Sequence, residues 1–444
     1  MPIGNLDIPG IGKEVVIPLM VVPHILIAAY IVGITLIAPI SEYVGVLTKQ
    51  PHYDRFARNA AKITLLLFAT GSAIAFTFVF ALISLYPVLW AQLQNVFFWV
   101  LLGEAFMFVG EVITVYAWYH AWDKMAYRKN LHVVFGLVAG LFGLGQQVLI
   151  NVVASYMLTP SEAPATSVGF TYLNPTYMPL NMHRFVGNWS FVGFLTAGWA
   201  AYRYLRVKSE SEREYYDWMG HWGLLWGFGF LLLQPIVGYG YMSEIRAHNP
   251  DAFDYLMLGE KSFLFNFLVI EIAIMSIASV AYFLHKLKFA VKPMPTVRNM
   301  TLGALGLISL FALLNAVPAD ASLIPQVGLV FGDGEAADIP LGSMYPWKYV
   351  GLWGVMLVGV FALGAYLKAS ATGFHWGRAS RWSQYALMAA AVTVVLTMMT
   401  MGYARETARR AGNGEDGWLI YGCLTLQNQQ FVSKGCPEAP ADNP

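Results

Sequence analysis

Cysteine and charge are both scarce in this sequence, and each scarcity excludes a class of protein. The 444 residues include only two cysteines, too far apart for a CxxC metal or redox motif, and no CxxCH sequence for attaching a c-type haem. Charged residues make up 12 % of the chain, the net charge is +1, and no basic domain suggests a nucleic-acid-binding protein. Residues 1–14 lack the pattern of a cleavable signal peptide, so the first apolar segment is expected to direct its own insertion.

Apolar residues are abundant, at 57 % of the chain with 15 % aromatic residues, and they form runs long enough to cross a bilayer. The sequence therefore predicts an all-α fold, a polytopic bundle of about ten transmembrane helices. The predicted spans are 15–40, 63–86, 96–122, 133–158, 182–204, 218–241, 263–284, 302–317, 347–368 and 385–403.

Lysine and arginine recur in alternate loops, which predicts the orientation of the bundle. The first loop carries Lys49, Arg55 and Arg58, and every second loop after it is also basic. The other loops are poor in cations and carry acids such as Asp251 and Asp333. We therefore expect the basic loops in the cytoplasm and both termini outside, on the periplasmic side.

The outer loops are longer and richer in Pro, Gly, Asn and Asp than the inner loops, which predicts a cap over the outer face. They cover residues 159–181, 242–262 and 318–346. The C-terminal tail is also expected outside, in an oxidising compartment, where Cys423 and Cys436 would form a disulfide. Two unpaired thiols are the alternative.

Two acids stand inside the third span, in the stretch LLGEAFMFVGE. A charged side chain near the bilayer centre costs about 2.5 to 3.5 kcal/mol on insertion scales. Glu104 and Glu111 are seven residues apart, close to two helical turns, and so share one face of the helix. That face is expected to meet a cofactor, a compensating charge or water.

Other costly residues are predicted at similar depth, in the outer half of the membrane. Imidazole and carboxylate are suited to haem iron, and interfacial cations to haem propionates. An intramembrane histidine can also serve only helix packing, and buried acids can belong to a proton-coupled transporter. The residues concerned are His24, Gln147, Asn151, His183, Arg184, Glu271, Lys348, Arg405, Glu406 and Arg409. Histidines near the inner ends of spans are expected at solvated or interfacial positions: His52, His120, His132, His221, His285 and His375.

The ordered set of these residues resembles subunit I of the cytochrome bd-type oxygen reductases. The resemblance is continuous over spans one to six and extends to the last two spans by motif. The matching positions are His24, Glu104 with Glu111, Gln147 with Asn151, His183 in NMHRFVGN, and Glu406 with Arg409 in MGYARETARR.

The resemblance implies a role for each matching residue. His24 would be the axial ligand of one high-spin haem and Glu406 that of the other, with Glu104 as a second ligand or proton donor beside them. His183 would bind the low-spin haem, and Glu111 would lie on the proton route to the oxygen site. Cationic Lys348, Arg405 and Arg409 would accompany the cofactors. Two or three haems b are implied, with haem d as an alternative at one high-spin site.

The sequence departs from the family pattern at three places. Lys348-Tyr349-Val350 replaces the Arg-x-Met that supplies a low-spin haem ligand, so Val350 stands in place of the methionine; Met182, Met242 and Met344 are the candidate substitutes. Residues 408–412, Ala-Arg-Arg-Ala-Gly, keep one arginine of Gly-Arg-Gln-Pro-Trp. The long hydrophilic loop of quinol-oxidising members is also missing after span six. The missing loop makes the sequence more similar to divergent bd-like proteins that also lack the quinol loop.

The sequence thus predicts a haem-bearing subunit of a bd-like terminal oxidase, an oxidoreductase that takes electrons from an outer cytochrome c rather than quinol. An electron conduit between periplasmic cytochromes and the quinone pool is the alternative. A second membrane subunit, and a periplasmic c-type cytochrome or larger respiratory complex, are the expected partners. The expected location is a bacterial or archaeal cytoplasmic membrane.

The sequence also predicts a division of the chain into four parts. These are a haem-bearing core, 1–241; a loop, two inserted spans and a cap, 242–346; the last two spans, 347–410; and the tail, 411–444.

Overall fold

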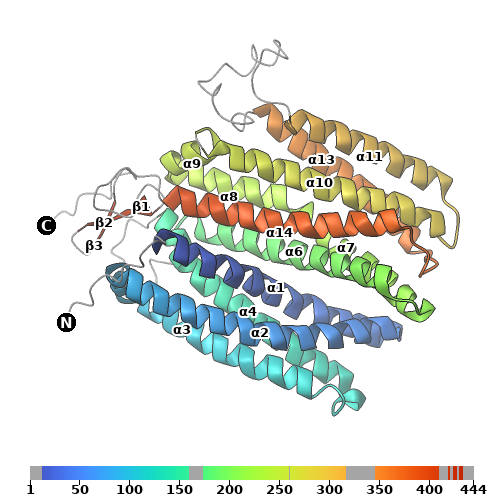
Figure 1. The fold of residues 1–444 in the computed structure, drawn as a ribbon, viewed down its shortest axis with the longest axis horizontal. Coiled ribbons are helices and arrows are strands. Elements are labelled where there is room, and N and C mark those ends of the chain that lie inside the picture. The colour runs from blue at the N-terminus through green and yellow to red at the C-terminus, as the bar shows by residue number, and fades with distance from the viewer. Residues whose placement is uncertain are drawn as a thin grey trace, which may run out of the picture. The chain divides into compact units, whose positions relative to one another are not determined.

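The computed structural model describes residues 13–159, 174–259, 261–316 and 346–409, with three short strands beyond them. These residues form an almost entirely helical fold (Figure 1). The helices are α1 Lys13–Thr48, α2 Pro51–Leu85, α3 Pro87–His120, α4 Lys129–Leu158, α6 Tyr177–Arg206, α7 Glu210–Leu231, α8 Gln234–His248, α9 Pro250–Met257, α10 Ser262–Lys286, α11 Pro295–Ala316, α13 Pro346–Ser370 and α14 Arg381–Arg409. Short 3-10 turns, Ala126–Arg128 and Leu287–Phe289, adjoin α4 and α10.

Nine stretches within the described residues are long and apolar enough to cross a membrane, so the chain is a multi-pass membrane protein. Each of the nine overlaps one of the predicted spans. The remaining predicted span, 182–204, does form a long helix, α6, but it is not among the nine. Its first half carries Asn181, His183, Arg184 and Asn188, which lower its hydropathy. The orientation of the termini stays a prediction.

The predicted sixth span is broken into α7 and α8 by a turn at Leu232 and Leu233. Pro235 explains the break, because proline has no N–H to donate to the preceding turn and its ring collides with the carbonyl four residues earlier. Prolines also mark helix starts: Pro51 and Pro87 open α2 and α3, where a missing N–H has no cost.

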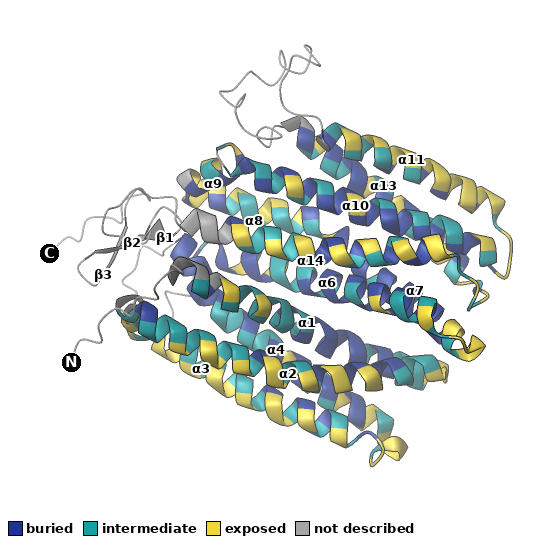
Figure 2. Ribbon diagram, in the orientation of Figure 1, coloured by how far each residue is buried: buried dark blue, intermediate teal, exposed yellow. Residues whose placement is uncertain are grey.

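Exposed apolar side chains recur along the helices, as lipid-facing surfaces require. Figure 2 shows exposed residues repeating along α2, α3 and α11. Leu66 and Phe80 on α2 are 63 % and 66 % exposed, and Phe106 on α3 is 68 % exposed. An aqueous surface would not hold so many large apolar groups, so these faces fit acyl chains.

The chain divides into two compact units. The first is drawn from Met1–Asn188, Gly240–Ala252 and Glu406–Pro444, and the second from Trp189–Tyr239 and Phe253–Arg405. In the first unit α1 packs on α2 and α4, and α3 packs on the same two helices. In the second unit α10 packs on α7, α11 and α13. The division expected from the sequence stays a prediction.

Small residues bring the part of α6 that lies in the second unit into close contact with α7. A Cβ on Gly193 of α6 would collide with the backbone nitrogen of Gly227 on α7, so only glycine fits there. The Ser190 hydroxyl on α6 donates to the Gly227 carbonyl at 2.9 Å. Close backbone approach through small residues, reinforced by a hydroxyl hydrogen bond, is typical of packed membrane helices.

The C-terminal tail contains an antiparallel sheet that the sequence did not predict. Its strands are β1 Leu419–Ile420, β2 Leu424–Gln427 and β3 Gln430–Ser433, in the order β1-β2-β3. The proposed disulfide falls on Cys423 and Cys436, which lie outside the described residues.

Candidate functional site

The acidic face of α3 meets α4 at Glu111, which is only 3 % exposed. The Gln146 side-chain amide on α4 donates a hydrogen bond to Glu111 Oε2. Glu111 Oε1 is also buried, and it has no hydrogen-bond partner among the described residues. A buried carboxylate with one oxygen unsatisfied is costly, which points to a role other than stability.

Gly143 on α4 makes room for this carboxylate. A Cβ built on Gly143 would lie 2.5 Å from Glu111 Oε1 and 3.2 Å from the carboxyl carbon. The oxygen without a partner therefore lies directly against the backbone of α4.

Glu104 lies two turns earlier on α3 and is partly buried. No hydrogen bond to its carboxylate is present in the part of the chain that the structure describes. Its oxygens are thus available to an added ligand or a proton, within an otherwise apolar stretch of helix.

His24 projects from α1 toward α2. Its Nδ1 lies 3.4 Å from the Gly71 carbonyl oxygen, a long contact, and the ring is partly buried. No hydrogen bond joins His24 to Glu104 within the described ranges. If Nδ1 carries the proton directed at Gly71, Nε2 is left as the acceptor, the arrangement that metal-binding histidines commonly have.

The polar face predicted on α4 contacts the start of α6. The Asn188 amide donates to Gln147 Oε1, and the Asn151 amide donates to Asn181 Oδ1 at 2.8 Å. The Arg184 guanidinium also donates to Asn151 Oδ1. This confirms that Gln147 and Asn151 share one face, as their four-residue spacing predicts.

His183 lies on α6 next to Arg184, and its ring centroid is 5.8 Å from that of Tyr241 on α8. The ring is partly buried within the first unit. His24, Glu104, Glu111 and His183 thus all belong to this unit, whereas their iron-binding roles stay predictions.

The remaining predicted cofactor residues are placed differently. Lys348 belongs to the second unit, where it is fully buried and its Nζ donates to Asn266 Oδ1 at 2.6 Å. Helix α14 continues through Arg405, Glu406 and Arg409, but their side chains are outside the described part.

Glu271 is a second buried acid and lies on α10 of the second unit. It is 9 % exposed and accepts a hydrogen bond from the Thr400 hydroxyl on α14 at 3.0 Å. Its Oε2 has no partner among the described residues. Glu271 was predicted as a costly residue in the outer half of the membrane, but the family resemblance implied no role for it.

Two histidines expected at solvated or interfacial positions are buried instead. His132 on α4 is 0 % exposed, with Nδ1 2.6 Å from Glu42 Oε1 and Nε2 2.8 Å from the Trp118 carbonyl oxygen. Two oxygen acceptors suit an imidazolium, which donates from both nitrogens. His221 on α7 is 6 % exposed, with Nδ1 2.7 Å from the Tyr366 hydroxyl. The solvated placement was therefore wrong for both.

Two buried ion pairs were missed by the sequence reading. Glu42 pairs with His132 in the first unit, and Lys286 Nζ lies 2.5 Å from Asp217 Oδ2 in the second, with both side chains inaccessible to solvent. Glu42 in PISEYV lies just beyond the predicted first span, 15–40, so it lacks the signal of an acid inside a span that singled out Glu104.

Comparisons with known proteins agree with this architecture. The solved structure of bd oxidase from Geobacillus thermodenitrificans is similar over 90 % of this chain and 98 % of that chain, with a TM-score of 0.51 and 13 % sequence identity, a likeness of fold. No curated protein gives a significant match. The family profile for cytochrome bd terminal oxidase subunit I matches residues 15–255, the region that holds His24, Glu104, Glu111 and His183. Because that match covers more than half of the sequence, the chain belongs to the cytochrome bd terminal oxidase subunit I family.

Proposed function

We propose that this protein is a haem-bearing membrane subunit of a bd-like oxidase complex that reduces oxygen to water. The observation that carries the proposal is the Glu111 carboxylate, buried inside a membrane helix with one oxygen unsatisfied, within the region that matches the family. Oxygen reduction consumes protons inside the membrane, and such an acid is suited to deliver them.

The donor set fits haem. The family binds haem b and haem d, and iron in a porphyrin needs only axial ligands from the protein. His24 supports this use because its Nδ1 faces a backbone carbonyl and leaves Nε2 for a metal. Glu104 supports it because its partly buried carboxylate has no hydrogen bond among the described residues.

We assign the other cofactor contacts to the residues that match the family. His183 would ligate the low-spin haem and Glu406 one high-spin haem. Lys348, Arg405 and Arg409 would compensate propionate charge. Bound haem would supply the electron-transfer and oxygen-binding chemistry.

The chain's own residues would handle the protons. Glu111 would take a proton on Oε1 while Gln146 holds Oε2 and fixes the carboxyl plane. Glu104 lies about two turns away on the same helix and would receive the proton next. Gly143 would preserve the space that Oε1 needs.

We propose an outer c-type cytochrome as the electron donor and a second membrane subunit as partner. The connection from α8 to α10 is short, residues 249–261, and is mostly the helix α9. It offers no long hydrophilic loop for quinol. The family's subunit I typically pairs with subunit II, and the exposed apolar helix faces fit such a membrane partner.

An electron conduit without oxygen chemistry is the second candidate. The observation in its favour is Val350, which replaces the family's methionine ligand and is 61 % exposed on α13. A conduit would carry electrons between periplasmic cytochromes and the quinone pool.

Oxygen consumption by the purified complex tests the proposal. The complex is supplied with a reduced c-type cytochrome in one sample and with a quinol in another. Consumption with the cytochrome is expected. Oxygen consumption with quinol but not with the cytochrome would contradict the donor assignment. If neither donor supports oxygen consumption, the electron conduit is the candidate that remains.

A further inference from the structure

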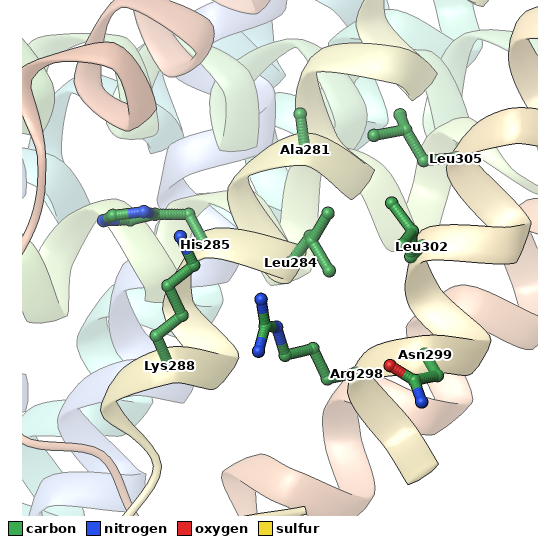
Figure 3. Close-up of a pocket in the computed structure, with 8 residues that line it drawn as sticks. All are labelled: Ala281, Leu284, His285, Lys288, Arg298, Asn299, Leu302 and Leu305. Carbon is green, nitrogen blue, oxygen red and sulfur yellow. The ribbon is translucent and has the colours of Figure 1, made fainter. Parts of the chain in front are cut away.

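We propose that the groove between α10 and α11, at their basic ends, binds the headgroup of an anionic phospholipid. The groove is a cavity of about 280 Å³ within the second unit. Figure 3 shows Lys288 and Arg298 beside it, with Leu284 and Leu302 farther along the helices. The complete lining is Ala281, Leu284, His285, Lys288, Arg298, Asn299, Leu302 and Leu305.

The polar end of the groove carries positive charge without compensation. Lys288 and Arg298 are both exposed, and neither forms an ion pair with a described residue. No Asp or Glu lines the cavity. Both cations line the same cavity without an acid, and a bound phosphate would compensate their charge.

Arg298 is also unfavourably placed for its own helix. It lies in the first turn of α11, which begins at Pro295. The start of a helix carries partial positive charge, so an acid would be stabilising there and an arginine is not. The positive end of α11 also attracts a phosphate. A bound phosphate would therefore compensate the repulsion between Arg298 and the helix start.

His285 adds a positioned ring at the edge of the groove. Its Nε2 accepts a hydrogen bond from the Ser380 backbone N–H at 2.9 Å. The neutral ring must then carry its proton on Nδ1, which makes that nitrogen a donor. Lys286 is not available to a ligand here, because it is buried against Asp217.

The apolar end of the groove distinguishes a lipid from free phosphate. Ala281 and Leu284 on α10 face Leu302 and Leu305 on α11 along the cavity. Leu302 is 56 % exposed, so an acyl chain would cover apolar surface that inorganic phosphate would leave bare. Charge at one end and leucine at the other match the two parts of a phospholipid.

The position along the helices also fits an anionic lipid. The cavity adjoins the connection between α10 and α11, which carries Lys288 and Lys292, and Arg298 follows in the first turn of α11. The positive-inside rule predicts that this end faces the cytoplasm. Basic pockets between membrane helices on that side are suited to anionic headgroups.

Native mass spectrometry of the detergent-solubilised complex tests the proposal. Phosphatidylglycerol is titrated against phosphatidylcholine, with wild type compared to the double variant Lys288→Ala/Arg298→Ala. Retention of phosphatidylglycerol should fall by about tenfold or more in the double variant, since each basic residue contributes to anionic lipid affinity. Lys292→Ala is the matched control, because it removes a cation from the same loop without touching the cavity, and it should bind as wild type does.

Two further outcomes would overturn the proposal. Equal retention by the double variant and the control would show that the cavity does not select the headgroup. In the second outcome, millimolar inorganic phosphate displaces bound phosphatidylglycerol to the same extent from wild type and from Leu302→Gln. That result would identify a free-phosphate site. The lipid proposal requires Leu302→Gln to weaken lipid retention while the complex stays assembled.

Discussion

Glu111 Oε1 on α3 lies against the backbone of Gly143 on α4, where a Cβ would stand 2.5 Å from that oxygen. Ordinary carbon–oxygen contacts are longer, so the carboxylate occupies space that only glycine leaves. The same carboxyl group is held from its other oxygen by Gln146. The position of the buried acid therefore depends on two residues of α4 that are three apart.

Gly143→Ala should displace Glu111 and weaken its hydrogen bond with Gln146. Overpacking of this kind costs about 1 to 3 kcal/mol, so the thermal midpoint of the purified complex should fall. Gly364→Ala on α13 is the control, because nothing lies within 4 Å of a Cβ there. That change should be neutral or should stabilise the helix by about 0.5 to 1 kcal/mol. Equal midpoints for the two variants would refute the packing relationship.

Glu111→Gln should leave the haem spectrum intact and slow oxygen consumption. Glutamine keeps the size of the side chain and can still bond with Gln146, but it cannot carry a proton. Loss of a positioned proton carrier reduces rates by about two orders of magnitude or more. Glu244→Gln on α8 is a matched change of a 42 % exposed acid and should have no effect on turnover. Full activity of Glu111→Gln would remove Glu111 from the proton route.

Glu42→Gln should destabilise the first unit strongly. The change leaves His132 and Lys129 facing a neutral amide in place of the buried carboxylate. Breaking a buried pair from one side costs about 3 to 5 kcal/mol. Asp123→Asn is the control, since it breaks a pair with Arg58 whose side chains are 49 % and 77 % exposed. Such surface pairs contribute about 0 to 1 kcal/mol, so similar losses in both variants would argue against the buried pair.

Asp217 and Lys286 should show strong coupling in the second unit. Asp217→Asn leaves a buried ammonium and Lys286→Met leaves a buried carboxylate, whereas the double variant removes both charges. The double variant should therefore be more stable than the sum of the two single losses predicts. Thermal midpoints of the four proteins measure the coupling, and additive losses would contradict a direct pair.

Nine of the ten spans predicted from apolar runs overlap a candidate membrane span among the described residues, because a bilayer sets the length that each span needs. The break between α7 and α8 was not predicted, although Pro235 gave the signal. Helix α6 was correctly predicted as a helix. Its polar residues, among them His183 and Arg184, lower its mean hydropathy, so it is not among the nine candidate membrane spans. The small sheet in the tail was missed because its strands are only two to four residues long.

The shared face of Gln147 and Asn151 could be predicted from spacing within one helix. Their partners Asn188 and Asn181 could not, because contacts between helices depend on rotation and register. For the same reason the contact of Gln146 with Glu111, 35 residues apart in the chain, could not be predicted. The contact of Glu42 with His132, 90 residues apart, could not be predicted either. Sequence reasoning found the costly acid in α3 but not the groups that hold it.

The most direct test of the proposed function is the dithionite-reduced absorption spectrum of the purified complex, recorded with and without carbon monoxide. An oxygen-reducing subunit should show low-spin and high-spin haem signals, and carbon monoxide should shift the high-spin signal. His24→Ala should abolish that shift while the low-spin signal remains. A haem spectrum that carbon monoxide leaves unchanged would contradict oxygen reduction at this subunit, and the absence of any haem signal would contradict the haem assignment itself.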